Sequence, residues 1–499
     1  MQKCLTLALA TGLIHAAVIQ GTVVENQTGH QVARATVRLE PISGTRETAR
    51  SIRTDRGGYF GFTGLAAGAY LLTASRIGFA TIQYGQRQWK SAGVPVVVGE
   101  NDSFTLSIRL PRFGAISGTI FDENGVGLPD HDVVAYRNTR PPQLTGGRAT
   151  SDDRGVFRIS GLEPGSYIVR SAGKQYEDSS YLPTFSRETQ TLDQSFPVQV
   201  DLDTEVDRAD IRPVTGRLFG LTIEAIPVPP NPTQPLPVTM TLVSELGRET
   251  VQANVHRFGP LPVGQYELFL QAPLDNSPGF QGDYRRITLA QDTTLKVVLH
   301  QENPTRFSID GGANAGSVRV LARRNDLAGP GTAEVLSLTG ERVLLPVGPW
   351  QFAVQPNPAF YVSGFSGPRV PPPDGLRPDG WNDYVVGEGL GIVKFTLSPS
   401  PSALHGTVKS GGMPVVGAPV FLEPTDLEPV RRVTSFLSTR TDVQGNYYFT
   451  GLTPGNYRVL SSFEYLAVDS AIMLNSGAMQ FEVEKGQNLQ RDLDLYVIP

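Results

Sequence analysis

The stretch DDRGVFRISGLEPGSYIVRS, residues 152–171, holds two short β-strands and the turns that bound them. Apolar and polar residues alternate from Val156 to Ile159 and again after Tyr167, which is typical of half-buried strands. Pro164 presets φ and Gly165 gives the backbone freedom that a tight turn needs. The stretch therefore predicts two strands joined by a tight turn, with Leu162 and Tyr167 in the core.

The turn in this stretch belongs to a motif that recurs five times. Leu, two residues, Gly, one residue and an aromatic appear as LAAGAY at 65–70, LEPGSY at 162–167, LPVGQY at 261–266, LPVGPW at 345–350 and LTPGNY at 452–457. The closing aromatics are 84–107 residues apart. A repeat of this length is the mark of a tandem array of similar units.

Other segments recur in phase with this motif. A first strand reads IQGTVV at 19–24, ISGTIF at 116–121, VTGRLF at 214–219 and LHGTVK at 404–409, and the fourth unit has only FSIDGG at 307–312. An Asp-x-x-Gly turn precedes the motif in units one, two and five, and the Asp is expected to bond backbone amides in an Asx-type turn. Each unit closes with two alternating segments, such as VVVGENDSFTLSIRL at 96–110, which we interpret as a hairpin.

These patterns predict an all-β chain, a tandem array of about five antiparallel β-sandwich domains after a signal peptide. The expected boundaries are 1–17 for the signal peptide, then 18–112, 113–213, 214–303, 304–401 and 402–499 for the domains. Domains three and four diverge from the others, and domain four carries a Pro-rich loop. No eleven-residue window outside the signal shows a helical stripe.

Composition agrees with this organisation. The 499 residues include 53 Gly and 39 Pro, which suit many turns, and 39% hydrophobic residues, which suffice for several cores. Only 18% of the residues are charged, which argues against long helices and coiled coils. The net charge of −5 gives no basic surface for nucleic acid, so no nucleic-acid partner is expected.

The first residues, MQKCLTLALATGLIHAA, have the features of a secretory signal peptide. Lys3 is the positive start, an apolar stretch runs to Ile14, and Ala16 and Ala17 are small residues where a peptidase cuts. The apolar stretch is shorter than a membrane helix requires, so no membrane span is expected. Cys4 is the only cysteine and lies inside the signal, which leaves the exported chain without disulfides or zinc thiolates.

The motifs resemble a known domain family. GTVVENQTGHQVARATVRL at 21–39, followed by DRGGYFGFTGLAAGAY at 55–70, is similar to the carboxypeptidase regulatory-like domain, which is prealbumin-like (transthyretin-like) and related to the collagen-adhesin B-type (Cna-B) repeat. GTVKSGGMPVVGAPVFL at 406–422 and DVQGNYYFTGLTPGNY at 442–457 repeat the likeness. YLPTF at 181–185 resembles a segment common in large exported proteins of soil bacteria, especially Acidobacteria. The resemblance implies a structural, spacing or binding module and, by analogy of fold alone, carbohydrate binding.

The sequence carries no recognisable catalytic, cofactor or metal site. It contains no Gly-x-Ser-x-Gly elbow, no His-Glu-x-x-His helix, no phosphate loop and no His-x-x-Glu zinc pair. The histidines after the signal lie far apart, and His256 is interpreted as structural. The acidic run DLDTEVDRAD at 201–210 is read as a solvated hairpin face, with a weak cation site as the alternative.

Aromatic residues after the closing Tyr strands are the best indication of a ligand surface. The candidate contacts are Trp89 in domain one, Tyr181 and Phe185 in domain two, and Trp381 and Tyr384 in domain four. Exposed aromatics stack on sugars or pack against protein partners. The alternative is that these side chains cover sandwich edges or the neighbouring domain.

Three functions remain open at this point. The first is an exported, non-enzymatic structural and interaction protein, secreted, periplasmic or at the cell surface, whose partner is a protein or polysaccharide of the cell envelope. The second is a carbohydrate-binding protein that uses the aromatics named above. The third, and weakest, is an enzyme with a site in domains three and four, which would require His256, His300 and acidic residues to meet in a pocket.

Overall fold

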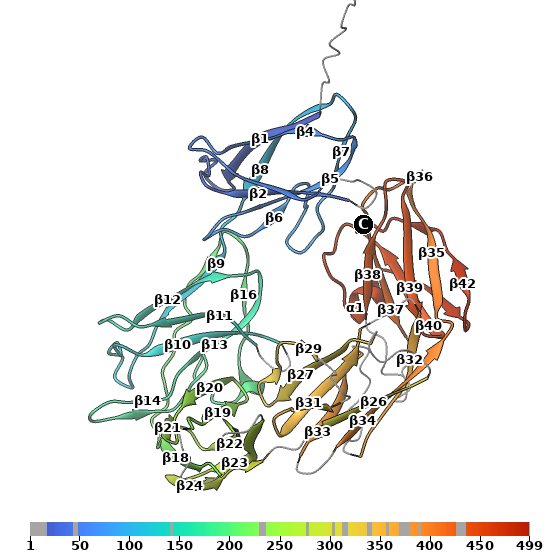
Figure 1. Cartoon of the computed structure of the whole chain (residues 1–499). Helices are drawn as coiled ribbons and strands as arrows, with labels where there is room; N and C mark the ends of the chain where they lie inside the picture. The colour runs from blue at the N-terminus through green and yellow to red at the C-terminus, as the bar shows by residue number, and fades with distance from the viewer. Residues whose placement is uncertain are drawn as a thin grey trace, which may run out of the picture.

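The computed structural model describes residues 17–42, 48–139, 143–228, 236–275, 279–301, 305–311, 318–336, 342–355, 359–368, 380–387, 391–425 and 436–498. Residues 1–16, which hold most of the predicted signal peptide, and most of the Pro-rich loop at 368–381 lie outside them. Figure 1 shows a series of β-sandwich domains arranged around a ring. Each domain has its own hydrophobic core, which confirms the predicted tandem β-sandwich fold.

Domain 1 sets the plan that the others follow. One sheet holds β4 (Tyr59–Leu65), β1 (Ala17–Glu25) and β8 (Ser103–Leu110). The second holds β3 (Arg50–Arg53), β2 (Thr36–Pro41), β5 (Gly68–Ser75), β6 (Ile82–Gln83) and β7 (Val96–Val98). Alternate residues of β1 are buried, as period-two patterning requires.

Domain 2 repeats this arrangement. Its first sheet holds β12 (Val156–Leu162), β9 (Gly114–Thr119) and β17 (Glu205–Val206), and its second holds β11 (Gln143–Thr150), β10 (Asp132–Arg137), β13 (Gly165–Ser171) and β16 (Val198–Val200). A small hairpin, β14 (Lys174–Gln175) and β15 (Ser180–Tyr181), and the 3-10 turn η1 (Leu192–Gln194) follow β13. The expected strands on both sides of Pro164 and Gly165 are β12 and β13.

Domains 3 and 4 keep the plan although their sequences diverge. Domain 3 pairs β21 (Val255–Leu261), β18 (Phe219–Ile226) and β24 (Thr293–Val298) against β20 (Gly247–Gln252), β19 (Thr239–Ser244), β22 (Gly264–Pro273), β23 (Phe280–Leu289) and β25 (His300–Gln301). Domain 4 pairs β30 (Arg342–Val343), β26 (Thr305–Asp310), β34 (Ile392–Pro399) and β32 (Phe360–Ser366) against β28 (Gly329–Pro330), β27 (Val320–Asp326), β29 (Glu334–Leu336), β31 (Gly348–Val354) and β33 (Asn382–Val386). The first strand of domain 3 begins at Phe219, so the assignment of VTGRLF at 214–219 to this strand was wrong except at its last residue.

Domain 5 completes the ring. One sheet holds β36 (Met413–Pro414), β35 (Ser402–Ser410), β39 (Asn446–Leu452), β42 (Asn488–Gln490) and β43 (Leu493–Asp494), and the other holds β38 (Leu437–Arg440), β37 (Pro419–Pro424), β40 (Gly455–Ser461) and β41 (Met479–Val483). It also contains α1 (Ser470–Asn475), a short helix that the periodicity did not predict. Asp469 caps α1 by accepting the Ile472 N–H at 2.8 Å.

The two closing strands of each domain do not form a hairpin, so that interpretation was wrong. In domain 1, β7 pairs antiparallel with β5, whereas β8 pairs parallel with β1 in the other sheet. The same crossing occurs in the other domains, where the last strand lies parallel to the first. Two alternating segments with a short turn fit a hairpin or an arch between sheets equally well, because alternation reports burial and not the hydrogen-bonded partner.

The repeated motif ends in the same bond in all five domains. The hydroxyls of Tyr70, Tyr167, Tyr266 and Tyr457 each donate to the carbonyl four residues earlier at 2.7–2.9 Å. In domain 4 the Trp350 indole N–H donates to the Pro346 carbonyl at 2.8 Å. The ring stays in the core while its polar atom satisfies a turn carbonyl, which explains why tryptophan replaces tyrosine there.

The Asp-x-x-Gly turns behave as predicted. Asp55 Oδ1 accepts the N–H groups of Gly57 and Tyr59 at 2.8 and 2.9 Å. Asp152 and Asp442 bond the N–H groups two and four residues ahead in the same way. These bonds stabilise the carboxylate, so the pKa of Asp152 is lowered, chiefly by the Val156 and Arg154 amides.

Candidate functional site: the pocket between domains 2 and 3

The candidate ligand-contact aromatics are mostly buried, so the expectation that they are exposed was wrong for three of them. Tyr181, Phe185 and Tyr384 are only 3%, 2% and 1% exposed. Tyr384 lies in the core of domain 4, and Tyr181 lies in the core of domain 2, edge-on to Tyr176. Buried rings of this kind cannot serve as a platform for a sugar without unfolding their surroundings.

The two tryptophans are half-buried. The Arg323 guanidinium lies over the Trp381 ring, 4.1 Å from its centroid. Trp89 lies in the loop before β7, next to residues that bond with domain 5. A ligand contact by either tryptophan stays a prediction.

Phe185 lies at the junction between domains 2 and 3. It belongs to a small apolar cluster made with Val134, Tyr136 and Ile168 of domain 2 and Leu246 of domain 3. Leu246 lies at the tip of the β19–β20 hairpin and is 9% exposed. The alternative weighed for Phe185, packing against a neighbouring domain, is therefore what the structure shows.

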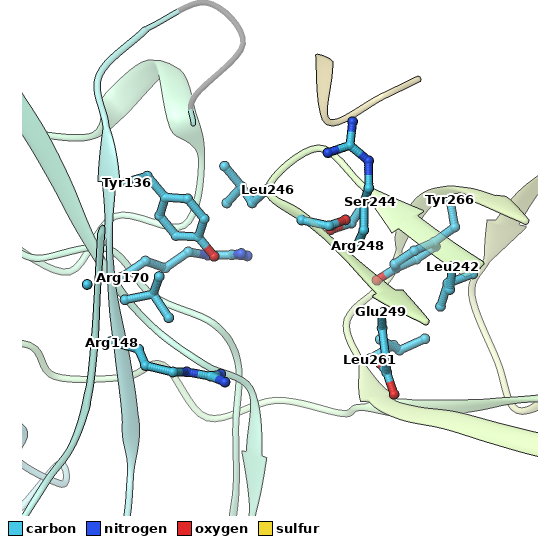
Figure 2. Close-up of a pocket in the computed structure, with 13 residues that line it drawn as sticks. Tyr136, Arg148, Arg170, Leu242, Ser244, Leu246, Arg248, Glu249, Leu261 and Tyr266 are labelled. Atoms are coloured by element: carbon cyan, nitrogen blue, oxygen red, sulfur yellow. The ribbon is translucent and has the colours of Figure 1, made fainter. Parts of the chain in front are cut away.

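A cavity of about 510 Å³ opens beside this cluster, between the second sheets of domains 2 and 3 (Figure 2). Domain 2 contributes residues of β10, β11 and β13, and domain 3 contributes residues of β19 to β22. Its lining includes Tyr136, Arg148, Arg170, Leu242, Ser244, Leu246, Arg248, Glu249, Leu261 and Tyr266. Cavities of this size typically hold small ligands.

Arg170 is the most unusual side chain of the pocket. It projects from β13, and its guanidinium lies 5.2 Å from the centroid of the Phe185 ring. Burial lowers the pKa of Arg170, and the neighbouring Tyr136, Tyr266 and Glu245 oppose that effect. Among the described residues, its buried Nε atom has no hydrogen-bond partner.

The other charged residues of the pocket differ in how firmly they are paired. Arg248 donates to both carboxylate oxygens of Asp326 in domain 4, at 2.8 and 2.6 Å, and to the Gly329 carbonyl. Arg148 is exposed and lies 3.8 Å from Asp132, beyond hydrogen-bond distance. Arg148 thus has only a loose ion pair, and the buried Nε of Arg170 has no hydrogen-bond partner among the described residues.

Sequence reasoning did not find this pocket, although one signal was present. The strand β10 reads DVVAYR, and four consecutive residues are buried where strict alternation would expose every second one. An apolar run of this kind marks a strand that is covered on both faces. Val134 and Tyr136 accordingly face away from the sandwich core and toward domain 3.

Neither His256 nor His300 is among the residues that line the pocket, although His256 neighbours one of them. His256 lies 3.9 Å from Glu249 and edge-on to Phe258, and His300 is an exposed residue of β25. Within the described residues there is no group of three or more His, Cys, Asp or Glu side chains suited to a metal ion. Asp203 of the acidic run instead bonds Asn26 and the Arg112 amide at the junction of domains 1 and 2.

Comparison with known protein families agrees with the β-sandwich fold of the first two domains. The family model of the carboxypeptidase regulatory-like domain matches residues 18–111 and 115–207. Domains 1 and 2 are carboxypeptidase regulatory-like domains. The pocket is therefore built from one regulatory-like domain, domain 2, and one divergent sandwich, domain 3. No curated protein matches the chain.

Several solved structures of pilin proteins resemble parts of the chain. The minor pilin GBS52 of Streptococcus agalactiae matches at 11% identity with a TM-score of 0.26, covering 40% of this chain and 97% of its own. The shaft pilin SpaA of Lactobacillus rhamnosus GG matches at 10% identity with a TM-score of 0.22 and the same coverages. The major pilin BcpA of Bacillus cereus matches at 10% identity with a TM-score of 0.15, covering 77% of this chain and 99% of its own. Scores of this size carry no functional conclusion.

Proposed function

We propose that this protein is an exported, non-catalytic structural and interaction protein of the cell envelope, in which five sandwiches form a closed frame. The observation that supports it is the contact between domain 1 and domain 5, which are the first and last of the array (Figure 1). The Ala92 N–H donates to the Phe463 carbonyl at 2.8 Å, and the Leu466 N–H donates to the Lys90 carbonyl. Arg87 pairs with Glu464 at 3.2 Å.

Contacts at the other junctions support a frame in which the domains hold one another. Between domains 1 and 2, the Asn26 amide donates to Asp203 at 2.9 Å. Between domains 3 and 4, the buried carboxylate of Glu267 accepts the Leu327 N–H at 3.0 Å, and the Arg324 guanidinium lies over the Phe269 ring. Contacts of this kind restrain each joint, whereas domains on free linkers would move independently.

Such a frame presents side chains from distant parts of the sequence at fixed separations, which suits binding to a large partner. The partner we propose is a protein or polysaccharide of the envelope. Export is proposed from the segment 1–17, of which only Ala17 is described. Ala17 is fully buried at the start of β1, so cleavage after Ala16 would keep this strand whole. Among the described residues, no helix has the length and apolar character needed to cross a membrane.

The proposal is tested in two steps with the full chain. Small-angle scattering of the purified protein is expected to give the compact dimensions of a ring, and an extended, string-like profile would overturn the closed frame. Fractionation of producing cells followed by cross-linking and mass spectrometry is expected to recover the processed chain with envelope components. Recovery in the cytoplasm with an intact N-terminus, or turnover of a broad panel of hydrolase substrates, would overturn the assigned role.

A further inference from the structure

The pocket between domains 2 and 3 has the charge of a site for an anion. The guanidinium of Arg170 is largely buried, its Nε has no hydrogen-bond partner among the described residues, and Arg148 stands exposed at the same pocket. Glu245 and Tyr136 act on the guanidinium but leave its Nε without an acceptor, and a buried donor without an acceptor is costly because its lost hydration is not replaced. An oxyanion that enters the pocket would supply the missing acceptor.

The neighbouring groups do not already fill this role, since Glu245 acts on Arg170 through its charge and makes no hydrogen bond to the buried Nε. The hydroxyl of Tyr266 donates to the Pro262 carbonyl. Glu249 is an exposed residue of the pocket that lies beside His256. Arg248 is held by Asp326, which leaves Arg170 and Arg148 to meet a ligand.

The residues that line the pocket indicate the chemical nature of the rest of the ligand. Val134, Leu242, Leu246 and Leu261 are apolar, and the rings of Tyr136 and Tyr266 come from the two domains (Figure 2). A guanidinium matches the two oxygens of a carboxylate with a pair of parallel hydrogen bonds. Apolar and aromatic walls around one such group favour a ligand with a ring-shaped body over a bare inorganic ion.

We propose that this pocket binds a small organic carboxylate with a body of one or two rings, held by Arg170 and Arg148 between domains 2 and 3. The carboxylate belongs either to a sugar acid or to an aromatic acid, and both present the same group to the guanidinium. The site is separate from the contact of domain 1 with domain 5, so the binding proposal is tested independently of the closed frame.

Calorimetric titration of the full chain distinguishes the possible sources. The probes are galacturonate, 4-hydroxybenzoate, neutral galactose and inorganic phosphate. Saturable binding of one of the two carboxylates, with galactose and phosphate at least about tenfold weaker, is expected from charge-assisted hydrogen bonds. Equal binding of galactose would show that the carboxylate is not recognised. Phosphate binding as tight as that of either carboxylate, or no binding of any probe, would likewise overturn the proposal.

Two variants and a control separate binding from folding. Arg148→Ala changes an exposed side chain and is expected to weaken carboxylate binding about tenfold or more. Arg170→Met keeps the aliphatic stem without a buried charge, so binding is expected to vanish while the melting temperature stays the same or rises. Arg154→Ala removes an exposed arginine from the Asp152 turn of the same domain and is expected to bind normally. If Arg170→Met unfolds domain 2, or binds as the unmodified chain does, Arg170 is structural and the assignment is wrong.

Discussion

Gly417 of domain 5 lies directly against domain 1, so one added methyl group at this position tests whether the ring is closed. Gly417 has φ of +67°, and a Cβ atom placed on it would lie 2.5 Å from Cγ of Pro95 and 2.7 Å from Cδ1 of Ile42, both in domain 1. Ordinary contacts of a Cβ atom are 3.4–4 Å. The end of the Ile42 side chain can turn away, but the Pro95 ring is rigid, so Gly417→Ala is expected to displace domain 1 from domain 5 by up to about 1 Å.

The cost of this displacement follows from the contacts at the junction. A shift of about 1 Å would stretch the 2.8 Å bond from Ala92 to Phe463 beyond hydrogen-bond range. The two backbone hydrogen bonds contribute about 0.5–1.5 kcal/mol each. The Arg87–Glu464 pair adds about 1 kcal/mol at most, because Arg87 is 69% exposed. Together these come to about 1–4 kcal/mol, so the closed state should lose about fivefold to 1,000-fold in population relative to the open one.

Gly411→Ala is the matched control. Gly411 lies in the same domain with φ of +57°, and nothing lies within 4 Å of a Cβ atom placed there. Both substitutions place alanine at a positive φ, which destabilises the fold by about 1 kcal/mol in each case. Only the alanine at position 417 contacts domain 1. Hydrogen exchange at the Ala92 and Leu466 amides, together with small-angle scattering, measures the opening. Fast exchange and larger dimensions are expected for Gly417→Ala alone. Equal exchange and equal dimensions in the two variants would refute the closed ring.

Three further predictions concern domain 2. Ser151→Ala removes a buried hydroxyl that donates to the Leu128 carbonyl and accepts the His131 N–H, so hydrogen exchange of β10 and β13 should report a loss of about 2–4 kcal/mol, with domain 5 unchanged. Leu162→Ala empties a fully buried core position and should cost about 2–5 kcal/mol in the same assay, and an unchanged exchange rate would contradict the core assignment. Burial lowers the pKa of His131 below its usual 6.5, so the unfolded chain binds the proton first and domain 2 should lose stability as the pH falls below about 6.5. Denaturant melts at pH 7.5 and pH 5 measure this loss, and equal midpoints for domain 2 would disprove it.

A buried hydroxyl recurs immediately before the Asp-x-x-Gly turns of domains 1, 2 and 5. The residue before each Asp-x-x-Gly turn is Thr54, Ser151 or Thr441. Each hydroxyl is buried and donates to a carbonyl of an earlier loop. It also accepts a hydrogen bond from the N–H just before the strand that follows that loop. Its recurrence is visible in the sequence, but its role requires knowing that the loop 19–26 residues earlier folds over it.

The turns, the alternating strands and the repeat can be predicted from the sequence because the interactions that form them span few residues. The Asp55 carboxylate reaches amides two and four residues ahead, and the Tyr167 hydroxyl reaches a carbonyl four residues back. Side chains at such spacings meet whatever the rest of the chain does, so residue type and spacing suffice to predict them. The core positions follow for the same reason, since a strand exposes its faces in strict alternation.

Partners that are distant in the chain depend on how the domains are placed, and local patterns do not encode that placement. The closing strands could have formed hairpins, yet β8 lies beside β1 and β7 beside β5. Phe185 reads as a loop aromatic until Leu246 of the next domain covers it. Arg87 and Glu464 are 377 residues apart, and Arg170 gains its significance only from the wall that domain 3 sets opposite it. Burial, pairing and charge at these places are properties of two surfaces in contact, so the frame and its pocket emerge only when the domains are assembled.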